Sequence, residues 1–479
     1  MRAGITTMLL GALLWPLAGV AQSDATPERG AGTTLQQVLD SSLRHLPRVL
    51  AAQSSVVGRQ ALITAAEGGF DPRFDGSLGG RLGGYYDGHA ADGALVQDFP
   101  LLNARAFAGY RIADGSFPVY ENSDLTLSGG EVRAGVGLSL LRDREIDDQR
   151  AAVLESQLDL LATTQELNAV KLDLLETAYV SYARWLMSAR LLAAYEELLQ
   201  LAEARGVALA TQVESGAAAE ILQVENDQAI LQRRALVVDA QRQLDMAAQQ
   251  LALYLRDADG AMQEPVYAPS LDLPPEQQAL LTRPLADLVA AVLELRPEIR
   301  QLEVAREKAG LDERMALNSM QPKIDLEYYA SRDIGRGPFN LIGTDNVAKL
   351  SFSVPLRTRT ASGKAAAARA EMDSIGHSLR QLQDQLALDI RQSLLNLDAT
   401  RELERLAQQE LDVSRQLAEA EAQRFSAGIS DFFLLNIRER QVGEAQLRRL
   451  QAQLTHQVAL AQFYAATMSL EGFGVDGLE

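Results

Sequence analysis

The sequence predicts a mainly α protein with a small β part, built twice along one chain. Three observations support this prediction: a composition typical of long helices, strand-like alternation in each half, and an internal repeat. Of the 479 residues, 47% are apolar but only 5% are aromatic. Ala, Leu, Gln, Glu and Arg are abundant, as they are in long helices. One compact globule is therefore not the expected form.

The composition also excludes several classes of function. The formal net charge is -19, and no segment dense in Lys and Arg is present to neutralise phosphates, so a nucleic-acid partner is not expected. The chain contains no cysteine, which rules out disulfides, thiolate metal sites and a lipid attached to an N-terminal cysteine. The four histidines form no metal-spaced pair, and no phosphate-binding loop or G-x-S-x-G motif occurs. The sequence therefore predicts no enzyme, no cofactor and no metal site.

Residues 1–21 have the pattern of a signal peptide. Arg2 gives a minimal positive charge, residues 5–17 form an apolar core, and Gly19-Val20-Ala21 is a small-residue cleavage site before Gln22. The apolar run is shorter than the roughly 20 residues of a membrane span, which favours cleavage over a retained anchor helix. No other stretch reaches that length. If the mature protein crosses a membrane, it does so without a transmembrane helix.

The internal repeat is the strongest signal in the sequence. Seven residues recur 250 positions later without a gap: Leu35, Pro47, Val49, Pro72, Arg73, Phe74 and Asp75 return as Leu285, Pro297, Ile299, Pro322, Lys323, Ile324 and Asp325. Further on, Leu141 and Arg142 match Leu356 and Arg357 at a spacing of 215, and Gly216 matches Gly428 at 212. The halves are therefore collinear, with 35 extra residues in the first copy between Pro72 and Leu141.

Each half is predicted to have the same order of elements. The first repeat, residues 22–267, has a helix pair divided by Pro47, a β-hairpin at 72–141, and long helices at 145–212 and 217–256. After a linker at 268–284, the second repeat has a helix pair divided by Pro297, a β-hairpin at 322–356, and long helices at 363–425 and 431–468. It extends over residues 285–470, and residues 471–479 form a C-terminal tail. The longest runs would each extend on the order of 90 to 100 Å.

The hairpins alternate between apolar and polar residues. In the second copy Ile324, Leu326 and Tyr328 alternate with Asp325 and Glu327. A soluble sandwich with one wet face is an alternative. However, two hairpins separated by more than two hundred residues leave unpaired edges, which closure into a membrane barrel would remove. Such closure would need several chains, and strands of about nine to eleven residues could cross a bilayer.

The 35 extra residues of the first hairpin allow two interpretations. Residues 87–124 are rich in Gly, Asp and Asn, but Ala106, Ala108, Tyr110 and Ile112 alternate with other residues. This segment is either an additional strand pair or a long outer loop. We expect a partly structured extracellular loop, and the strand count stays even in both cases.

The long helices carry apolar residues at spacings of three and four. One stripe runs through Leu379, Leu382, Leu386 and Ile390, and another through Leu447, Leu450 and Leu454. This spacing is typical of coiled-coil packing between antiparallel helices. A dimeric or filamentous coiled coil is the alternative, but filaments do not need duplicated hairpins of alternating pattern.

A glycine turn separates the long helices in each half. In the second half it lies within residues 424–435, and in the first half within residues 212–222; in each, a Leu follows the glycine after six residues. Glycine readily adopts the left-handed conformation that ends a helix, so Gly216 and Gly428 are expected to have that backbone role. Asp431 is most simply an N-cap or first-turn acid. Phe432 and Phe433 are expected to pack within the helices rather than to form a plug.

The chain resembles TolC-type outer-membrane efflux proteins (outer membrane factors) over essentially all of its mature length. The resemblance is carried by the duplicated order of elements, by residues at the strand-to-helix junctions and by the helical turn Arg424-Phe425-Ser426-Ala427-Gly428. The junction residues are Ser353-Val354-Pro355-Leu356 and Ser139-Leu140-Leu141-Arg142. Each short motif is weak, but their order at these spacings is specific.

The resemblance implies an architecture, a location and a function. It implies a homotrimer in which four strands per subunit complete a twelve-stranded transmembrane β-barrel in outer-membrane lipid. This barrel would continue into a long antiparallel α-helical barrel that crosses the periplasm. The protein would then be the passive exit duct of a tripartite efflux or type I secretion system, for small molecules or proteins. A structural or adhesive coiled-coil envelope protein without channel activity is the alternative.

The resemblance also implies partners and sites. A periplasmic adaptor (membrane fusion) protein would dock at the turns and link the duct to an inner-membrane pump that supplies the energy. The implied docking residues are Ser215, Gly216, Arg424, Phe425, Ser426 and Gly428, and the implied junction residues are Leu141, Arg142, Pro355 and Leu356.

The chain departs from the family pattern at the expected constriction. The family commonly places an acidic residue six positions after the second turn glycine, but this chain has Leu434 there. Asp431 and Asn436 are the candidate gate residues nearby. In a trimer Asp431 would occur three times around one axis, so a ring that attracts cations is an alternative to its capping role.

Overall fold

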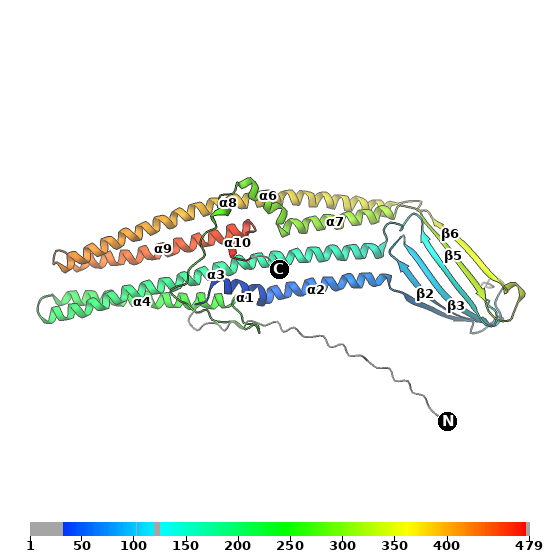
Figure 1. Ribbon diagram of the computed structural model, residues 1–479, viewed down its shortest axis with the longest axis horizontal. Helices are drawn as coiled ribbons and strands as arrows, with labels where there is room; N and C mark the ends of the chain where they lie inside the picture. The colour runs from blue at the N-terminus through cyan, green and yellow to red at the C-terminus, as the bar shows by residue number, and fades with distance from the viewer. Residues whose placement is uncertain (1–31, 102, 119–124, 476–479) are drawn as a thin grey trace, which may run out of the picture.

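The computed structural model describes residues 32–101, 103–118 and 125–475. The predicted signal peptide, residues 1–21, lies outside the described residues. Figure 1 shows an elongated molecule with a β-sheet at one end and two helical turns at the other. Among the described helices, none is both long enough and apolar enough to span a membrane.

The helices occur in two matching sets. In each copy an 11-residue helix is followed, after one residue, by a helix that begins with proline, then by the sheet, and then by two long antiparallel helices. The longest helix has 67 residues in the first copy and 68 in the second, or about 100 Å each. The first set is α1 (Leu35–His45), α2 (Pro47–Glu67), α3 (Asp148–Glu214) and α4 (Glu220–Ala252); the second is α6 (Leu285–Leu295), α7 (Pro297–Asn318), α8 (Arg359–Ser426) and α9 (Phe432–Ala466). Short helices are α5 (Gln278–Leu281), α10 (Leu470–Phe473) and the 3-10 helices η1 (Gly68–Phe70) and η3 (Phe339–Leu341).

Local sequence explains where these helices begin. Thr34 caps α1 in a capping box with Gln37. Pro47 and Pro297 each occupy the first turn of a helix, where a missing N–H has no consequence. Asp147 caps α3, because its carboxylate accepts the N–H of Arg150 at 2.8 Å.

The sheet has six antiparallel strands in sequence order, from β1 to β6. They are β1 (Arg73–Gly80), β2 (His89–Phe99), β3 (Ala104–Asp114), β4 (Glu131–Ser139), β5 (Lys323–Asp333) and β6 (Thr344–Ser353). Our expectation of a loop at residues 87–124 is therefore wrong, because β2 and β3 form a strand pair there. The expected hairpin at 72–141 is also corrected, since β1 and β4 lie apart with this pair between them. The alternation through Ala106, Ala108, Tyr110 and Ile112 was the correct signal.

The helices next to the sheet form a wall one helix thick. Here α2, α3, α7 and α8 lie side by side (Figure 1), and ion pairs cross each seam. Arg48 pairs with Asp173 at 2.5 Å, Lys308 with Asp159 at 2.6 Å, and Arg369 with Glu313. The hydrogen bond to Asp159 raises the pKa of Lys308. Towards the turns, α4 and α9 take the places of α2 and α7, so four helices again lie abreast.

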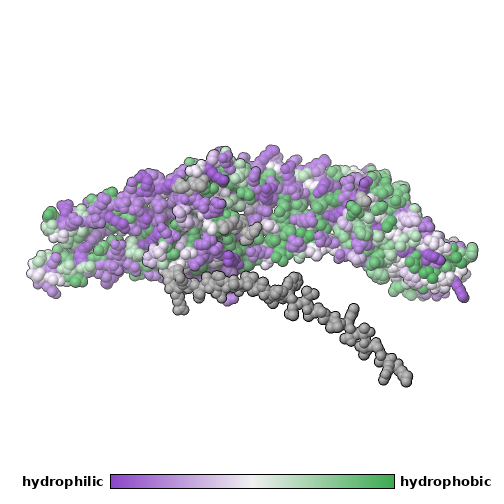
Figure 2. All heavy atoms as spheres, viewed as in Figure 1, coloured by the Kyte–Doolittle hydropathy of each residue, from purple (hydrophilic) through white to green (hydrophobic). Residues whose placement is uncertain are grey.

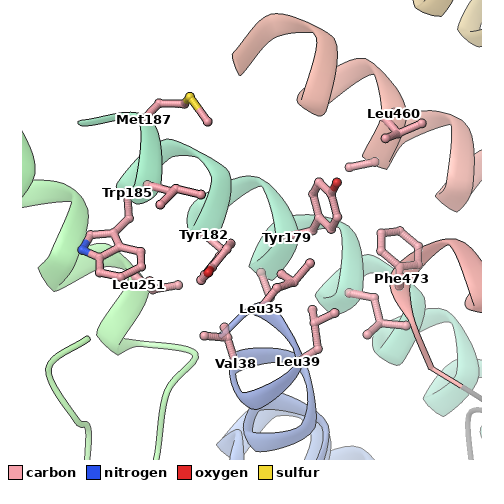
Figure 3. Close-up of a cluster of buried hydrophobic side chains, with 14 of the residues drawn as sticks. Leu35, Val38, Leu39, Tyr179, Tyr182, Trp185, Met187, Leu251, Leu460 and Phe473 are labelled. Atoms are coloured by element: carbon pink, nitrogen blue, oxygen red, sulfur yellow. The ribbon is translucent and has the colours of Figure 1, made fainter. Parts of the chain in front are cut away.

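The main core lies at the waist of the molecule. Trp185, Tyr182 and Tyr179 of α3 pack against α1, α4, α9 and α10 (Figure 3). The hydroxyl of Tyr182 donates to the carbonyl oxygen of Thr33 at 3.1 Å, and that of Tyr179 donates to Gln457 at 2.6 Å. Burial raises the pKa of Tyr182 to about 12, so its hydroxyl remains neutral. The buried hydroxyls therefore have partners, as a stable core requires.

The linker between the repeats, residues 268–284, forms hydrogen bonds to the helices around this core. Glu276 contacts His456 of α9, with Oε1 2.5 Å from Nε2, and accepts from Arg401 of α8 at 2.9 Å. Asp272 accepts from Arg190 of α3 at 2.9 Å, and this hydrogen bond lowers the pKa of Asp272. One connecting segment is thus bonded to three long helices.

We predict that Trp185→Ala destabilises the protein by about 3–5 kcal/mol, because it removes a large, fully buried side chain and leaves a cavity. Val207→Ala on the same helix is the matched control, since Val207 is 72% exposed. The measurement is chemical denaturation followed by circular dichroism. Equal midpoints for the two variants would contradict a core located at Trp185.

Candidate docking tips and strand-to-helix junctions

The two turns between the long helices have the same backbone geometry. Gly216 has φ +74° and Gly428 has φ +73°, the left-handed region that favours glycine. The N–H of Gly428 donates to Phe425 at 3.0 Å and that of Ile429 donates to Arg424 at 2.9 Å. The first turn repeats both bonds, from Gly216 to Val213 at 2.9 Å and from Ala217 to Gln212 at 2.8 Å. Both are Schellman motifs, which satisfy the last carbonyls of a helix.

The predicted docking residues lie on these turns at the end opposite the sheet (Figure 1). Ser215 and Ser426 are exposed, and each hydroxyl donates to a carbonyl three residues earlier, at 3.0 and 2.8 Å. Arg424 is exposed and lies 3.6 Å from the buried carboxylate of Glu421. A Cβ added to Gly216 or Gly428 would meet only open space. Both turns therefore present their backbone and the side chains of Ser215, Arg424 and Ser426 outward, whereas Phe425 is half-buried.

Three successive residues at the start of α9 have different roles. Asp431 is the N-cap, and its carboxylate accepts the N–H of Leu434 at 2.7 Å, which confirms the expected capping role. Phe432 is buried against Phe425, with ring centroids 6.1 Å apart, so its expected packing is confirmed. Phe433 is 67% exposed, so the packing expected for it is wrong within this chain.

The two candidate gate residues have different surroundings within one chain. Asn436 is half-buried and lines a groove between α4 and α9 with Leu236, Phe433 and Arg440. Asp431 is exposed on the turn, outside that groove. Within one chain, Asp431 therefore caps α9, and Asn436 faces the groove between α4 and α9.

A buried ion cluster near the turns was not anticipated from the sequence. Glu439 of α9 accepts from Arg205 of α3 at 3.0 Å and from Arg233 of α4 at 2.6 Å. Arg233 also donates to the carbonyl oxygen of Leu198 at 2.6 Å. These three side chains join the helical pair of the first copy to that of the second. Their separation in sequence, more than 200 residues between Glu439 and either arginine, left no motif to detect.

The first strand-to-helix junction depends on two residues that the sequence did not single out. Asp143 has φ +69°, and its N–H donates to Asn318 at 2.9 Å while the Asn318 amide donates back to its carboxylate at 2.9 Å. Of the predicted junction residues, Arg142 donates its N–H to Pro322 at 3.3 Å, and Leu141 is exposed. Because Asp143 adopts a left-handed conformation that its sequence context does not indicate, this role could be seen only in the structure.

The second junction is simpler. Pro355 is half-buried and follows β6, where it cannot continue the strand ladder. Leu356 is 95% exposed. The two copies therefore turn from sheet to helix in different ways, although their sequences match at this point.

Residues 288–468 match the family model described as outer membrane efflux protein. This part of the chain, most of the second repeat, is therefore similar to the outer membrane efflux protein family that the sequence resemblance pointed to. The match supports the expected role as an outer-membrane channel component of a tripartite efflux system. The match lies in the second repeat, and the structural duplication extends the same element order to the first. A comparison with curated proteins finds no match.

Several solved structures share the fold of this chain. The CmeC outer membrane channel of Campylobacter jejuni is 13% identical, with 97% of this chain and 94% of that chain covered and a TM-score of 0.62. The open state of the Neisseria gonorrhoeae MtrE outer membrane channel is 16% identical, with coverages of 91% and 89% and a TM-score of 0.61. The outer membrane protein VceC of Vibrio cholerae is 14% identical, with coverages of 90% and 95% and a TM-score of 0.60. At these identities the similarity concerns the fold.

We predict that Glu439→Gln destabilises the protein by about 3–5 kcal/mol, because buried Arg233 and largely buried Arg205 lose the carboxylate that they share. Glu410→Gln is the matched control, since its ion pair with Arg448 is half-exposed and is worth at most about 1 kcal/mol. Denaturation midpoints measure both effects. A Glu439→Gln variant as stable as the control would show that the cluster does not hold the helical pairs together.

Proposed function

We propose that three copies of the chain assemble into a passive exit duct in the outer membrane. The sheets close into one transmembrane barrel, and the helices continue as a tube across the periplasm. The turns at Gly216 and Gly428 dock a periplasmic adaptor protein, which links the duct to an inner-membrane pump. The single observation that carries this proposal is that one chain forms an open, one-layer wall with unpartnered edges.

The edge helices support closure by further copies. On α4, Ile221, Val224, Leu231 and Val238 are each more than half exposed, at spacings of three and seven residues. This is the a/d spacing of a coiled-coil seam without a partner. At the other edge α8 exposes Leu395, Leu403 and Val413, each also more than half exposed. Apolar stripes on both edges of a curved wall are complementary between neighbouring copies.

The sheet supports the location in the outer membrane. Hydrophobic side chains gather at the sheet end of the molecule, whereas hydrophilic ones predominate over the helices (Figure 2). Phe74, Leu78, Leu350 and Phe352 on the edge strands are each more than 60% exposed. Lipid is the environment in which an apolar face of this extent is stable.

The turns and the start of α9 have separate roles in this assembly. Each chain has two exposed turns of the same backbone shape at one end. Three chains would therefore offer an adaptor six similar turns. Three copies also place three Asp431 carboxylates around the axis, where they would attract cations, and Asn436 lies about one and a half turns further along α9. The capping bond to Leu434 fixes the position of each carboxylate.

The proposal is tested by isolating the protein from the outer-membrane fraction. We expect heat-modifiable trimers on gels and ion conductance in planar lipid bilayers. A soluble periplasmic product without conductance would overturn the proposal. That result would favour a structural or adhesive coiled-coil protein, the alternative suggested by the long helices.

We predict that Gly428→Val impairs export without dissolving the trimer. Valine strongly disfavours φ near +73°, so the exposed turn that contacts the adaptor changes shape. Gly376→Val is the matched control, because Gly376 lies within α8 with open space around its Cα. Cargo export and adaptor pull-down measure the effect. Normal export by Gly428→Val would count against a docking role for this turn.

A further inference from the structure

The strand pair β2–β3 has no counterpart in the second copy. It lies between β1 and β4, and each of its strands has 11 residues, as β5 does. Eleven pairs of residues join β2 to β3, and the pairing continues to β1 on one side and β4 on the other. The pair is therefore part of a continuous ladder. Its length suits a bilayer crossing of about nine to eleven residues.

The two faces of the added strands continue the two faces of the rest of the sheet. Directly paired residues share a face, so Phe74 of β1 shares its face with Leu95, Ala108 and Ala134 across β2, β3 and β4. On the strands, every exposed large apolar residue in the described part of the chain belongs to this outward face: Phe74, Leu78, Leu95, Phe99, Tyr110, Ile112, Val132, Val136, Leu326, Tyr328, Leu350 and Phe352.

The opposite face of β2 and β3 carries charged residues that form ion pairs between strands. Asp98 of β2 accepts from Arg73 of β1 at 2.5 Å and from Arg105 of β3 at 2.7 Å. Asp92 of β2 accepts from Arg133 of β4 at 2.6 Å. These ion pairs tie the added strands to both neighbours on the inner face. A surface loop would need no such confinement of the ion pairs to one face and of the exposed large apolar residues to the other.

The connections of the added strands also follow the pattern of membrane barrels. The turn from β2 to β3 is short, residues 100–103, and lies at the helical end. There the side chain of Gln97 donates to the carbonyl oxygen of Phe70 at 2.6 Å. The connections at the far end, residues 81–88 and 115–130, are longer. Short turns on the periplasmic side and long loops on the outer side are typical of outer-membrane barrels.

From these observations we infer that β2 and β3 cross the membrane, so that three copies close an eighteen-stranded barrel whose exit is as wide as the helical tube. This inference rests on the proposed trimeric duct and specifies its membrane part. It replaces the twelve strands that the family resemblance implies for the barrel.

The widths of the two parts agree with this strand number. Six strands about 4.8 Å apart and tilted by about 40° cover an arc of about 38 Å. Four helices abreast, about 9–10 Å apart, cover about 36–40 Å. Eighteen strands give a barrel about 36 Å across between backbones, whereas twelve at the same tilt give about 24 Å. Six strands and four helices from each chain therefore cover arcs of equal width, so the barrel and the helical tube have the same diameter.

The duplication and the two faces of the sheet together give the register between neighbouring chains. At the spacing of 215 found at Leu141, matched residues of β4 and β6 would lie on opposite faces, so within these strands we match outward Val136 with outward Leu350, 214 positions apart. Strands β1 and β5 correspond at 250. Gly137 pairs with Glu327 between β4 and β5. The equivalent pair between β6 and β1 of the next copy is Ser351 with Ser77, both on the inner face. All six strands alternate in direction, so this contact is antiparallel, as closure requires.

Spin labels test whether β2 and β3 lie in the membrane. Because the chain has no cysteine, single variants Leu95→Cys, Val96→Cys, Ala106→Cys and Phe107→Cys can be labelled in trimers reconstituted into vesicles. Outward labels at 95 and 106 should be accessible to oxygen in the bilayer, and inward labels at 96 and 107 to a water-soluble nickel complex. Ala330→Cys and Tyr329→Cys on β5 give the reference alternation. Uniform access to the nickel complex along β2 and β3 would overturn the inference.

A disulfide pair tests the strand order within one chain. In the six-stranded order Asp75 pairs with Ala94, so Asp75→Cys with Ala94→Cys should form an intrachain disulfide on oxidation. If β2–β3 lay outside the barrel, β1 would pair with β4 as β5 pairs with β6. Asp75→Cys with Gly137→Cys would then crosslink instead, by correspondence with Asp325 and Ser351. Peptide mass spectrometry distinguishes the two, and efficient crosslinking of the second pair would overturn the inference.

A third pair separates this inference from the proposed duct. Ser77→Cys with Ser351→Cys should crosslink neighbouring copies, whereas Ser77→Cys with Phe352→Cys, on opposite faces, should not. Absence of trimers and of intermolecular crosslinks would overturn the duct and the inference together. Trimers whose β2–β3 labels are uniformly in water would overturn only the eighteen-stranded barrel.

Discussion

The pairing of backbone groups at the two edges of the sheet is the constraint on which the rest of the structure depends. In lipid, an unpaired N–H or C=O loses several kcal/mol relative to water, so a sheet can cross a membrane only as a closed barrel. One chain supplies six strands with β1 and β6 as edges. In the proposed duct, closure therefore requires further copies of the chain, and the arrangement of these copies would fix the geometry of the helices that adjoin the strands.

The helices meet this constraint by forming a wall instead of a bundle. A bundle would bury the apolar stripes of α4 and α8 within one chain, whereas here they remain exposed at the two edges. Stability within the chain is concentrated at the waist, around Trp185, and in the cluster around Glu439. The core around Trp185 excludes water with aromatic side chains. The ion cluster around Glu439 joins the two repeats of the chain where few large apolar residues are available.

The sequence predicted those parts of the fold that depend on local pattern. The repeat, the long helices, the turn glycines and the cap at Asp431 each depend on residues close together in the chain or in strict register. The strand pair β2–β3 was misjudged because Ala and Gly occur on both of its faces and Val96 and Phe107 lie on the inner one, so its alternation is weak in hydrophobicity even though its ladder is complete. Glu439 with its arginines and Asp143 with Asn318 could not be predicted, since only the folded chain brings them together.

The two turns show how a duplicated backbone can differ in stability. Gly216 and Gly428 have nearly equal φ values and identical hydrogen-bond patterns, so the turns share one shape. However, Asp431 caps α9, whereas Ala219 at the start of α4 has no side-chain cap, a difference of about 1 kcal/mol. Phe432 and Glu439 also anchor α9 to α3. The second turn is therefore the more firmly held of the two, and a partner that reshapes the tip meets less resistance at the first.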